Sequence, residues 1–405
     1  MVNRSSAPLA GVRILEFDDG GLAQFGGKLL ADLGADVVKI EPPQGAGGRR
    51  TPPFHGGDDH PNRSLHFWFY NGSKRSLVLD PAAGPTAEQL RGLLLGAMVV
   101  LDGLDEPLLS QLGLAAADLE RAFPGLVYCR VSPFGDTGPW SDHRSSDLVQ
   151  LALGGVMAVC GYDDVPGAPP IAPSGGQSSH LVGIAIATGV TAALLHRQRS
   201  GQGQIVDIAT HDVVSVSTEM SFAYWEFQQA NPHRQTGRHA RPYDSPPWNH
   251  RCRDGKYFCT LPLYLNDERF SAMVTWFDEE GLAEDLTGPD YGTDGFRATR
   301  MDHIVGVIAR FCAAHDSAHL FTEAQKRRLP WAPVNSPHDL LDDQHLRDRR
   351  AFTVVHHDDL DVSLTYPGAP YKLSATPWRS PTRAPHLGEH TEELLLELGE
   401  REGHR

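Results

Sequence analysis

Apolar runs of strand length alternate with helix-like segments along the first third of the chain. Five runs are bounded by Gly, Pro or charged residues and lie at 11–17, 36–41, 76–80, 98–101 and 126–132. Between them, three segments have the helical spacing of apolar residues, at 26–33, 88–95 and 114–122. A strand, a helix and a strand within about thirty residues form a βαβ unit. The pattern therefore predicts an α/β fold, with helices packed on a parallel sheet.

A second pattern joins the apolar segment 181–195 to a short strand at 205–208. The basic cluster 196–199 ends the apolar segment, and Gly201 follows it. Cations in a last helical turn interact favourably with the helix dipole, and a Gly just beyond them is a typical C-cap. Gly and Thr residues interrupt the segment, and it falls short of the ~18 apolar residues of a membrane span. We therefore expect a buried helix.

The pattern changes after Asp207. The pattern of segment 213–229 predicts one long helix rich in aromatic residues. Segment 231–250 is irregular and holds four prolines, which is typical of a domain boundary or an active-site loop. Residues 253–256 are typical of a hairpin turn. We predict three parts: a large domain's N-terminal part at 1–225, a small domain at 226–320, and the large domain's C-terminal part at 321–405.

The composition narrows the functional classes. Of 405 residues, 40% are hydrophobic, and the formal net charge of −15 argues against a nucleic-acid partner. The five cysteines include no C-x-x-C pair, so we expect no zinc site. The first residues lack the apolar core of a signal peptide, and the odd cysteine count fits a reducing compartment. We therefore expect a cytoplasmic protein without a membrane segment.

Several stretches, in order along nearly the whole chain, resemble the family III CoA-transferases. They are LAGVRILEF, ADLGADVVKIEPPQGAGGRR, NGSKRSLVLD, LVYCRVSPFGDTGPW, DLVQLALGGVMAVCGY, LLHRQRSGQGQIVD and LPWAPVNSPHDLLDDQHLRDR. The resemblance implies a Rossmann-like large domain with an inserted smaller α+β domain. It also implies an interlocked homodimer, or a heterodimer with an active homologue. Its substrates would be coenzyme A or an acyl-CoA together with a carboxylic acid.

The resemblance further implies which residues lie near CoA. The implied CoA-binding residues are Lys39, Glu41, Arg49, Arg50, Ser132 and Phe134. Arg49 and Arg50 would contact phosphate groups, because a guanidinium matches phosphate geometry. The alternative is a solvated loop with two exposed arginines. Segment 102–107 departs from the family, since it carries three acids where relatives carry a cation, which is unfavourable near a polyanion.

The family's chemistry depends on an aspartate that attacks the acyl-CoA carbonyl, because a carboxylate is both nucleophile and leaving group. The resemblance places this aspartate eighteen residues before Arg197, where the chain has Ser179, and no Asp or Glu occurs from 166 to 206. We therefore expect Ser179 to replace the nucleophile and the mechanism to be modified. The alternative is that Ser179 only lines a pocket or caps a helix.

Three further residues are candidates for acid/base chemistry. Imidazole titrates near neutrality, which makes His180 a candidate, although adjacent helix residues such as Ser179 and His180 do not face each other. By analogy with the 2-methylacyl-CoA racemases, which place a His directly before an Asp, His143 and Asp147 would flank the same pocket. The alternatives are a first-turn helix residue for His180 and a solvated loop for the other two.

Three functions stay open. The first is a CoA-transferase that acts on an acyl-CoA or a carboxylic acid by a modified mechanism. The second is an isomerase, racemase or dehydratase that uses His180 or His143. The third is a non-catalytic subunit or ligand-binding homologue. Nothing in the sequence points to a metal, flavin, nicotinamide or pyridoxal cofactor. The Gly-rich segment 45–48 does not join a strand to a helix, as a phosphate-binding loop does.

Overall fold

The computed structural model describes residues 7–19, 21–79, 86–106, 116–261 and 266–402. The chain divides into two compact units. The first comprises Met1–Val156, Ala172–Thr218 and His345–Arg405, and the second comprises Met157–Ile171 and Glu219–Gln344. These ranges differ from the boundaries 1–225, 226–320 and 321–405 expected from the sequence, and the division into a large and an inserted small domain stays a prediction.

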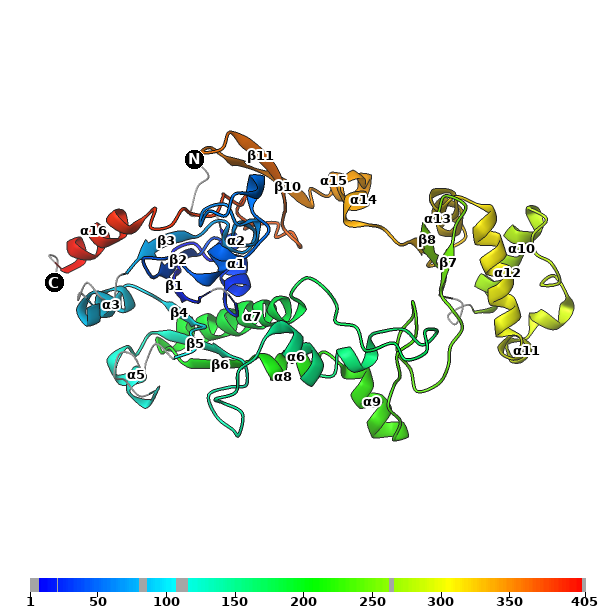
Figure 1. The fold of residues 1–405 in the computed structure, drawn as a ribbon, viewed down its shortest axis with the longest axis horizontal. Coiled ribbons are helices and arrows are strands. Elements are labelled where there is room, and N and C mark those ends of the chain that lie inside the picture. Colours follow the sequence, from blue (N-terminus) through cyan, green and yellow to red (C-terminus); the bar gives the residue numbers. More distant parts are fainter. Residues whose placement is uncertain (1–6, 20, 80–85, 107–115, 262–265, 403–405) are drawn as a thin grey trace. The chain divides into compact units, whose positions relative to one another are not determined.

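A parallel six-stranded sheet lies at the centre of the first unit, in the order β3-β2-β1-β4-β5-β6 (Figure 1). Its strands are β1 Arg13–Phe17, β2 Asp36–Glu41, β3 Arg75–Val78, β4 Val99–Asp102, β5 Val127–Ser132 and β6 Ile205–Ala209. All neighbouring strands are parallel. The predicted α/β class is confirmed, and the strand order is that of Rossmann folds, which reverses between β1 and β4.

Helices cover both faces of this sheet, as the nearly continuous apolar strands require. Successive strand residues point to opposite faces. On one face, Ile14 and Val99 pack with α1 (Gln24–Asp32) and α7 (Gln177–Ser200). On the other face, Leu15 and Val100 pack with α3 (Thr86–Leu95), α5 (Ala116–Ala122) and α16 (Thr391–Glu402).

Helices α1 and α7 approach closely because glycines lie where they meet. A Cβ on Gly26 would lie 2.5 Å from Ile186 Cγ2, and a Cβ on Gly183 would lie 2.4 Å from Phe25 Cδ1. Both distances are shorter than a carbon–carbon contact allows. The two glycines therefore fix the spacing of the helix pair on this face of the sheet.

Helix α7 ends as the sequence predicts. Gly201 has a φ of 76°, and its N–H donates to Arg197 O at 2.8 Å, which confirms the predicted C-cap. Among the described residues, α7 is the one helix that is long and apolar enough to cross a membrane. Val182, Ile186 and Val190 on this helix are buried in the sheet core, as in the core helix of a globular fold.

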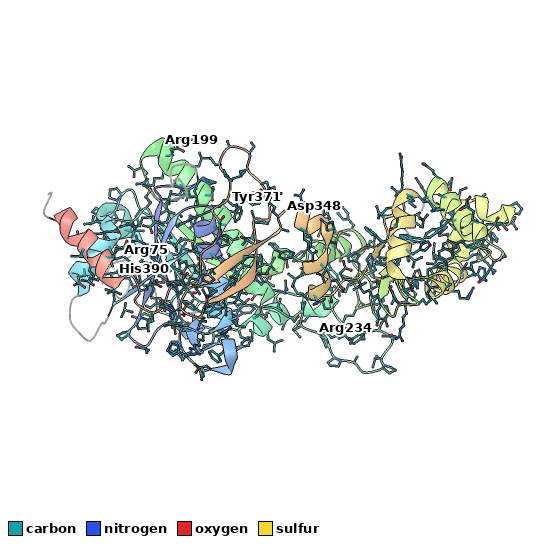
Figure 2. The ribbon with its side chains drawn as sticks, turned by 90° about the horizontal axis from the view of Figure 1, so that it is seen from above. Arg75, Arg199, Arg234, Asp348, Tyr371 and His390 are labelled. Carbon is teal, nitrogen blue, oxygen red and sulfur yellow. The ribbon has the colours of Figure 1, made fainter. Side chains whose placement is uncertain are left out.

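The C-terminal helix α16 is bound to the edge of the sheet at β3. Arg75 of β3 donates to Glu397 Oε1 at 3.1 Å and to Asp36 Oδ2 at 2.7 Å. His390 Nδ1, just before the helix, accepts from the Ser76 N–H at 3.3 Å. Figure 2 labels Arg75 and His390. These bonds attach the end of the chain to the sheet that its first half builds.

A small separate core completes the first unit. It joins α2 (Leu65–Asn71) to a hairpin of β10 (Phe352–His357) and β11 (Val362–Pro367) through Trp68, Val355 and Tyr366. Two short helices follow β5 and β6, namely α6 (Asp147–Leu153) and α8 (Thr210–Val216). The loop after β2 holds the 3₁₀ turns Gly47–Arg50 and His55–Gly57.

The second unit is mostly helical. Its helices are α9 Glu219–Gln228, α10 Asp267–Glu279, α11 Asp294–Thr299, α12 Met301–Ala314, α13 Ser317–Lys326 and α14 Pro337–Asp342, followed by α15 Gln344–Asp348 at the boundary. Strands β7 Asn249–Arg251, β8 Tyr257–Cys259 and β9 Ala332–Pro333 form an antiparallel sheet. The rings of Phe277 and Phe311 stack in the core with centroids 3.8 Å apart. The predicted hairpin turn is confirmed, with Gly255 at a φ of 84°.

The long helix predicted at 213–229 is wrong. Helix α8 ends at Val216, and α9 begins at Glu219 in the second unit. The hydroxyls of Ser217 and Thr218 donate to carbonyl groups three residues earlier, at 2.6 and 2.8 Å. Such local bonds compete with the helical backbone pattern. The apolar spacing continues through the break, so the pattern did not reveal it.

Candidate active site

A cavity of about 1230 Å³ opens at the carboxyl ends of the strands, where the strand order reverses. Residues 18–19 follow β1 and residues 103–106 follow β4, and both segments line it. In open α/β sheets this is the usual place for a ligand, because the reversal leaves a crevice outside the sheet. The volume exceeds that of a typical drug-sized pocket, so a ligand as large as a nucleotide cofactor fits.

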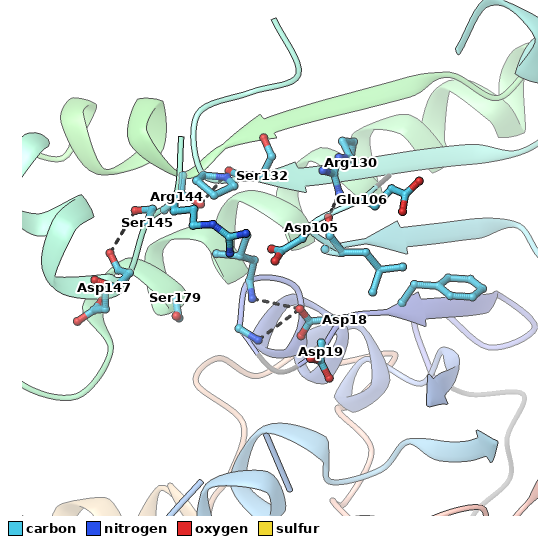
Figure 3. A pocket seen from close by; sticks show the side chains of 18 of the residues that line it. Asp18, Asp19, Asp105, Glu106, Arg130, Ser132, Arg144, Ser145, Asp147 and Ser179 are labelled. Carbon is cyan, nitrogen blue, oxygen red and sulfur yellow. Dashed lines mark hydrogen bonds between the residues drawn. The ribbon is translucent and has the colours of Figure 1, made fainter. Parts of the chain in front are cut away.

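The first turn of α7 brings two hydroxyl groups to the cavity. Ser178 and Ser179 both line it (Figure 3). Asp147, the first residue of α6, reaches this turn: its Oδ1 accepts from the Ser178 N–H at 2.9 Å and from the Ser178 Oγ at 2.6 Å. A carboxylate at a helix N-terminus is stabilised by the unpaired N–H groups and by the helix dipole. The structure therefore brings two of the predicted site residues, Asp147 and Ser179, to one place.

Ser179 lies beside this carboxylate without bonding to it. Within the described ranges, no hydrogen bond to the Ser179 hydroxyl is found, and the bonds from this turn to Asp147 come from Ser178. A serine hydroxyl attacks a carbonyl only when an adjacent base takes its proton. The geometry thus presents Ser179 as a cavity-lining hydroxyl rather than an activated nucleophile.

His180 does not line the cavity. Its ring packs edge-on against Phe25 with centroids 4.7 Å apart, and its Nε2 lies 3.2 Å from the Tyr70 hydroxyl. Burial lowers the pKa of His180, although the charge of Asp147 opposes the shift. Burial, assisted by Asp147, raises the pKa of Tyr70. Both groups are therefore uncharged at neutral pH. The acid/base role expected of His180 stays a prediction, and its place outside the cavity does not support it.

His143 and Arg144 do line the cavity, on the loop between β5 and α6. The His143 ring lies beside Phe134 and Trp140, with centroids 6.1 and 6.2 Å away. Figure 3 shows the Arg144 side chain extending into the cavity. Arg144 has no hydrogen-bond or ion-pair partner in the part of the chain that the structure describes. It is therefore a cation available to an anionic ligand.

Acidic side chains also line the cavity. They are Asp18, Asp19, Asp105 and Glu106, all just beyond β1 or β4. Asp18 Oδ1 accepts from the Leu22 N–H at 3.2 Å, and Asp19 Oδ1 accepts from the Gly47 N–H at 2.7 Å. Residues 103–106, which belong to the acidic segment noted in the sequence, thus contribute to the cavity wall. Like charges on the wall disfavour a polyanionic ligand close to them.

The predicted CoA-binding residues divide into two groups. Glu41, Arg50 and Ser132 line the cavity, whereas Lys39, Arg49 and Phe134 do not. Arg49 is fully buried and binds Glu41 in two places, through Nε at 2.6 Å and Nη2 at 2.7 Å. A bidentate pair of this kind uses the guanidinium face that would bind a phosphate. The CoA role of Lys39, Arg49 and Phe134 stays a prediction that the geometry does not support.

A buried charge network lies next to the cavity. Lys39 Nζ donates to Glu16 Oε1 at 3.0 Å and to Asp18 O at 2.9 Å, and Lys74 Nζ donates to Glu16 Oε2 at 2.7 Å. Burial alone would raise the pKa of Glu16, but the two ammonium groups reverse the shift and lower it. Burial lowers the pKa of Lys74 to about 8 against the attraction of Glu16. This network holds the chain at Asp18, where it enters the cavity wall.

Sequence reasoning missed four residues of this region: Tyr70, Ser178, Asp18 and Asp19. The two aspartates directly follow a predicted strand, so the rule that ligands bind at carboxyl strand ends would have found them. The bond from Ser178 to Asp147 spans 31 residues, and no local pattern reports it.

The fold and the cavity define a Rossmann-type α/β protein with a large ligand site at the strand reversal. The family model for CoA-transferase family III matches residues 9–391, and the chain belongs to this family. The resemblance inferred from the sequence motifs is thereby confirmed.

The relatives of this chain are CoA-transferases. It is 30% identical over 384 residues to the succinyl-CoA:(R)-benzylsuccinate CoA-transferase subunit BbsE of Thauera aromatica, covering 94% of this chain and 92% of that protein. It is 32% identical to the succinyl-CoA:mesaconate CoA-transferase of Haloarcula hispanica, covering 96% of each. A CaiB/BaiF family protein from Brucella suis has the same fold, with a TM-score of 0.82, 26% identity, and coverage of 97% of this chain and 100% of that one.

Proposed function

We propose that this chain is a subunit of a CoA-transferase that passes CoA from succinyl-CoA or a similar thioester to a second carboxylic acid. The observation that supports this most is the cavity of about 1230 Å³ at the strand reversal of a chain that belongs to CoA-transferase family III. Several relatives are named for succinyl-CoA and a second acid with two carboxyl groups. A dicarboxylic acid is therefore the substrate class we propose.

Arg144 supports a dicarboxylic substrate. One carboxyl group of such an acid must react, while the other stays charged inside the cavity. A buried carboxylate needs a cation or several donors. Arg144 extends into the cavity without a partner among the described residues, so its guanidinium is the donor we assign to the carboxylate that does not react.

We further propose that the reacting carboxylate comes from a partner chain. Ser179 stands where the family motif has its nucleophile, its hydroxyl lacks a base within the described residues, and no Asp or Glu occurs from 166 to 206. Two relatives are named as subunits: BbsE, and the beta subunit of the succinyl-CoA–L-malate CoA-transferase of Chloroflexus aurantiacus, which is 28% identical. A pair of similar chains in which one carries the nucleophile fits both observations.

Exposed apolar side chains on the first unit support a second chain. Leu148 and Leu153 on α6, Ile184 on α7 and Val216 on α8 are each more than half exposed. The three helices are neighbours in the fold. Clustered apolar side chains of this size on a surface are typical of an interface. The proposed assembly is a dimer, either of identical interlocked chains or with an active homologue.

The test is a transfer assay with succinyl-CoA and a panel of mono- and dicarboxylic acids. We expect the purified chain alone to be inactive and a complex with a homologue that carries the motif aspartate to be active on dicarboxylic acids. Ser179→Asp in the chain alone should raise the rate above background. If the chain alone transfers CoA and Ser179→Ala abolishes the reaction, Ser179 is the nucleophile and the subunit proposal is wrong.

One observation favours an isomerase or racemase as a second candidate: His143 lines the cavity, whereas His180 does not. An acid/base pair needs only a positioned proton carrier and no carboxylate nucleophile. Incorporation of deuterium from D₂O into a 2-methylacyl-CoA, lost in His143→Gln, would support this candidate over transfer.

A further inference from the structure

Three helix ends in the second unit bring two imidazoles and a carboxylate together. Glu280 directly follows α10, His315 directly follows α12, and His319 lies in the first turns of α13. One ligand atom of each lies within 4.8 Å of the others. We propose that Glu280, His315 and His319 form a binding site for a transition-metal dication of the Zn²⁺ type.

Hydrogen bonds orient two of these three residues as ligands. His315 Nδ1 donates to Phe311 O at 2.7 Å, and a carbonyl can only accept, so Nδ1 carries the proton. The Nε2 of the same ring forms an ion pair with Glu280 Oε2, and a bound ion would replace this pair by contacting both atoms. Glu280 Oε1 accepts from Trp276 Nε1 at 2.7 Å. Metal-binding histidines typically donate their second ring N–H to a carbonyl or carboxylate, which fixes the nitrogen that binds the ion. His315 has this arrangement.

His319 supplies the third ligand. Its Nε2 lies 3.9 Å from Glu280 Oε1, and its ring stacks on that of His315 with centroids 5.5 Å apart. Two imidazole nitrogens and one carboxylate oxygen form a ligand set that Zn²⁺ accepts, with a fourth position left for water. The His319 side chain is 50% exposed, so an ion can enter from solvent.

The metal site would join the ends of three helices. Since a metal ion binds the folded site and not the separated ligands, binding would stabilise the contacts among α10, α12 and α13. The expectation that the chain has no zinc site rested on cysteine spacing alone. The present ligands include no cysteine: His315 and His319 are close in sequence, and Glu280 comes from the end of a different helix.

The test uses the full chain, treated with a chelator and titrated with ZnCl₂ in a calorimeter. We expect one ion bound per chain, with binding abolished by the chelator and restored by added ZnCl₂. His319→Ala and Glu280→Gln should each weaken binding by at least about tenfold. His338→Ala is the matched control, since His338 is an exposed histidine of the same unit, on α14.

The visible absorption of a Co²⁺-loaded sample gives a second readout, because a four-coordinate site absorbs more strongly than the hydrated ion. His319→Ala should reduce this band, and His338→Ala should leave it unchanged. The proposal is overturned if the wild-type chain binds no ion. It is also overturned if His319→Ala and Glu280→Gln bind as tightly as the wild type, since the ion would then occupy others of the chain's 20 histidines.

Discussion

Replacing Asp147 by Ala tests the contact between α6 and the first turn of α7. Asp147 Oδ1 accepts two bonds from Ser178, at 2.6 and 2.9 Å. A hydrogen bond to a charged group contributes about 1.5–3 kcal/mol, and an anion at a helix N-terminus about 0.3–1 kcal/mol. Because Asp147 is half-buried, water can replace part of the hydrogen bonding and of the charge interaction that the substitution removes, which lowers the cost. We expect Asp147→Ala to cost about 2 kcal/mol and Asp147→Asn, whose amide oxygen still accepts, about 1 kcal/mol.

A double-mutant cycle isolates this contact. Asp147→Ala, Ser178→Ala and the double variant are unfolded in urea and followed by far-UV circular dichroism, with amide exchange in the first turn of α7 as a local readout. Both bonds join the same two residues, so the coupling energy should be about 1–2 kcal/mol. Ser146→Ala is the control: Ser146 caps α6 through Val149 N–H, at 3.3 Å, so its effect should add to that of Ser178→Ala.

The same variants separate a structural role of Asp147 from a chemical one. If Asp147 only holds α7, Asp147→Asn should weaken thioester binding and leave the turnover of the complex with the active homologue within about tenfold. A loss of turnover by about a thousandfold without a change in stability would show that the carboxylate reacts. The structural reasoning is refuted if the effects of Asp147→Ala and Ser178→Ala add within about 0.5 kcal/mol.

Three further predictions concern packing, pH and substrate. Gly183→Ala places a Cβ 2.4 Å from Phe25 Cδ1, so we expect the free energy of unfolding measured in urea to fall by about 1–3 kcal/mol. Gly295→Ala is the control, because Gly295 has open space around it and the substitution should cost no stability. Equal stabilities of the two variants would contradict the packing argument. Burial lowers the pKa of His250 to about 4. In the unfolded chain His250 binds a proton below about pH 6.5, whereas in the folded protein it stays neutral over this range. The contribution of His250 to the free energy of unfolding is therefore full above about pH 6.5 and declines by up to about 3 kcal/mol as the pH falls to about 4. The stability difference between the wild type and His250→Gln should therefore narrow between pH 7.5 and pH 5, and a constant difference would refute the assignment. Arg144→Ala should raise the KM for a dicarboxylic acid by about ten- to a hundredfold and spare a monocarboxylic acid, with partial recovery in Arg144→Lys; equal losses for both acids would exclude the proposed contact.

Local patterns were sufficient to predict the sheet, because each strand is an apolar run that must be buried on both faces. The segment 36–41 is apolar at Val37, Val38 and Ile40, and all three are buried in β2. The C-cap at Gly201 followed from the basic turn before it. The break between α8 and α9 did not follow, since it depends on where two hydroxyl groups bond and on which unit each side joins.

The candidate site was harder to predict from the sequence because its residues are far apart along the chain and are brought into contact only by the fold. Ser179, His143 and Asp147 were predicted and do line one cavity. Ser178 was missed, although it determines where the Asp147 carboxylate lies. Arg49 was predicted as a phosphate ligand from its residue type, but the structure buries it against Glu41, a partner eight residues away that the loop conformation selects.

The residues that carry the family resemblance mostly build the fold. In the segment 31–50, Lys39 supports Glu16, and a Cβ on Gly47 would lie 2.5 Å from Asp19 O. In the signature 194–207, Gly203 could carry no side chain, because its Cβ would lie 1.9 Å from Leu126 O. Such positions are constrained by packing whatever the protein does, so a match at them indicates the fold and does not identify the reaction. The reaction depends instead on the cavity wall, which Ser179 and the acidic residues after β4 line. A measurement on those residues therefore tests function more directly than any further match of motifs.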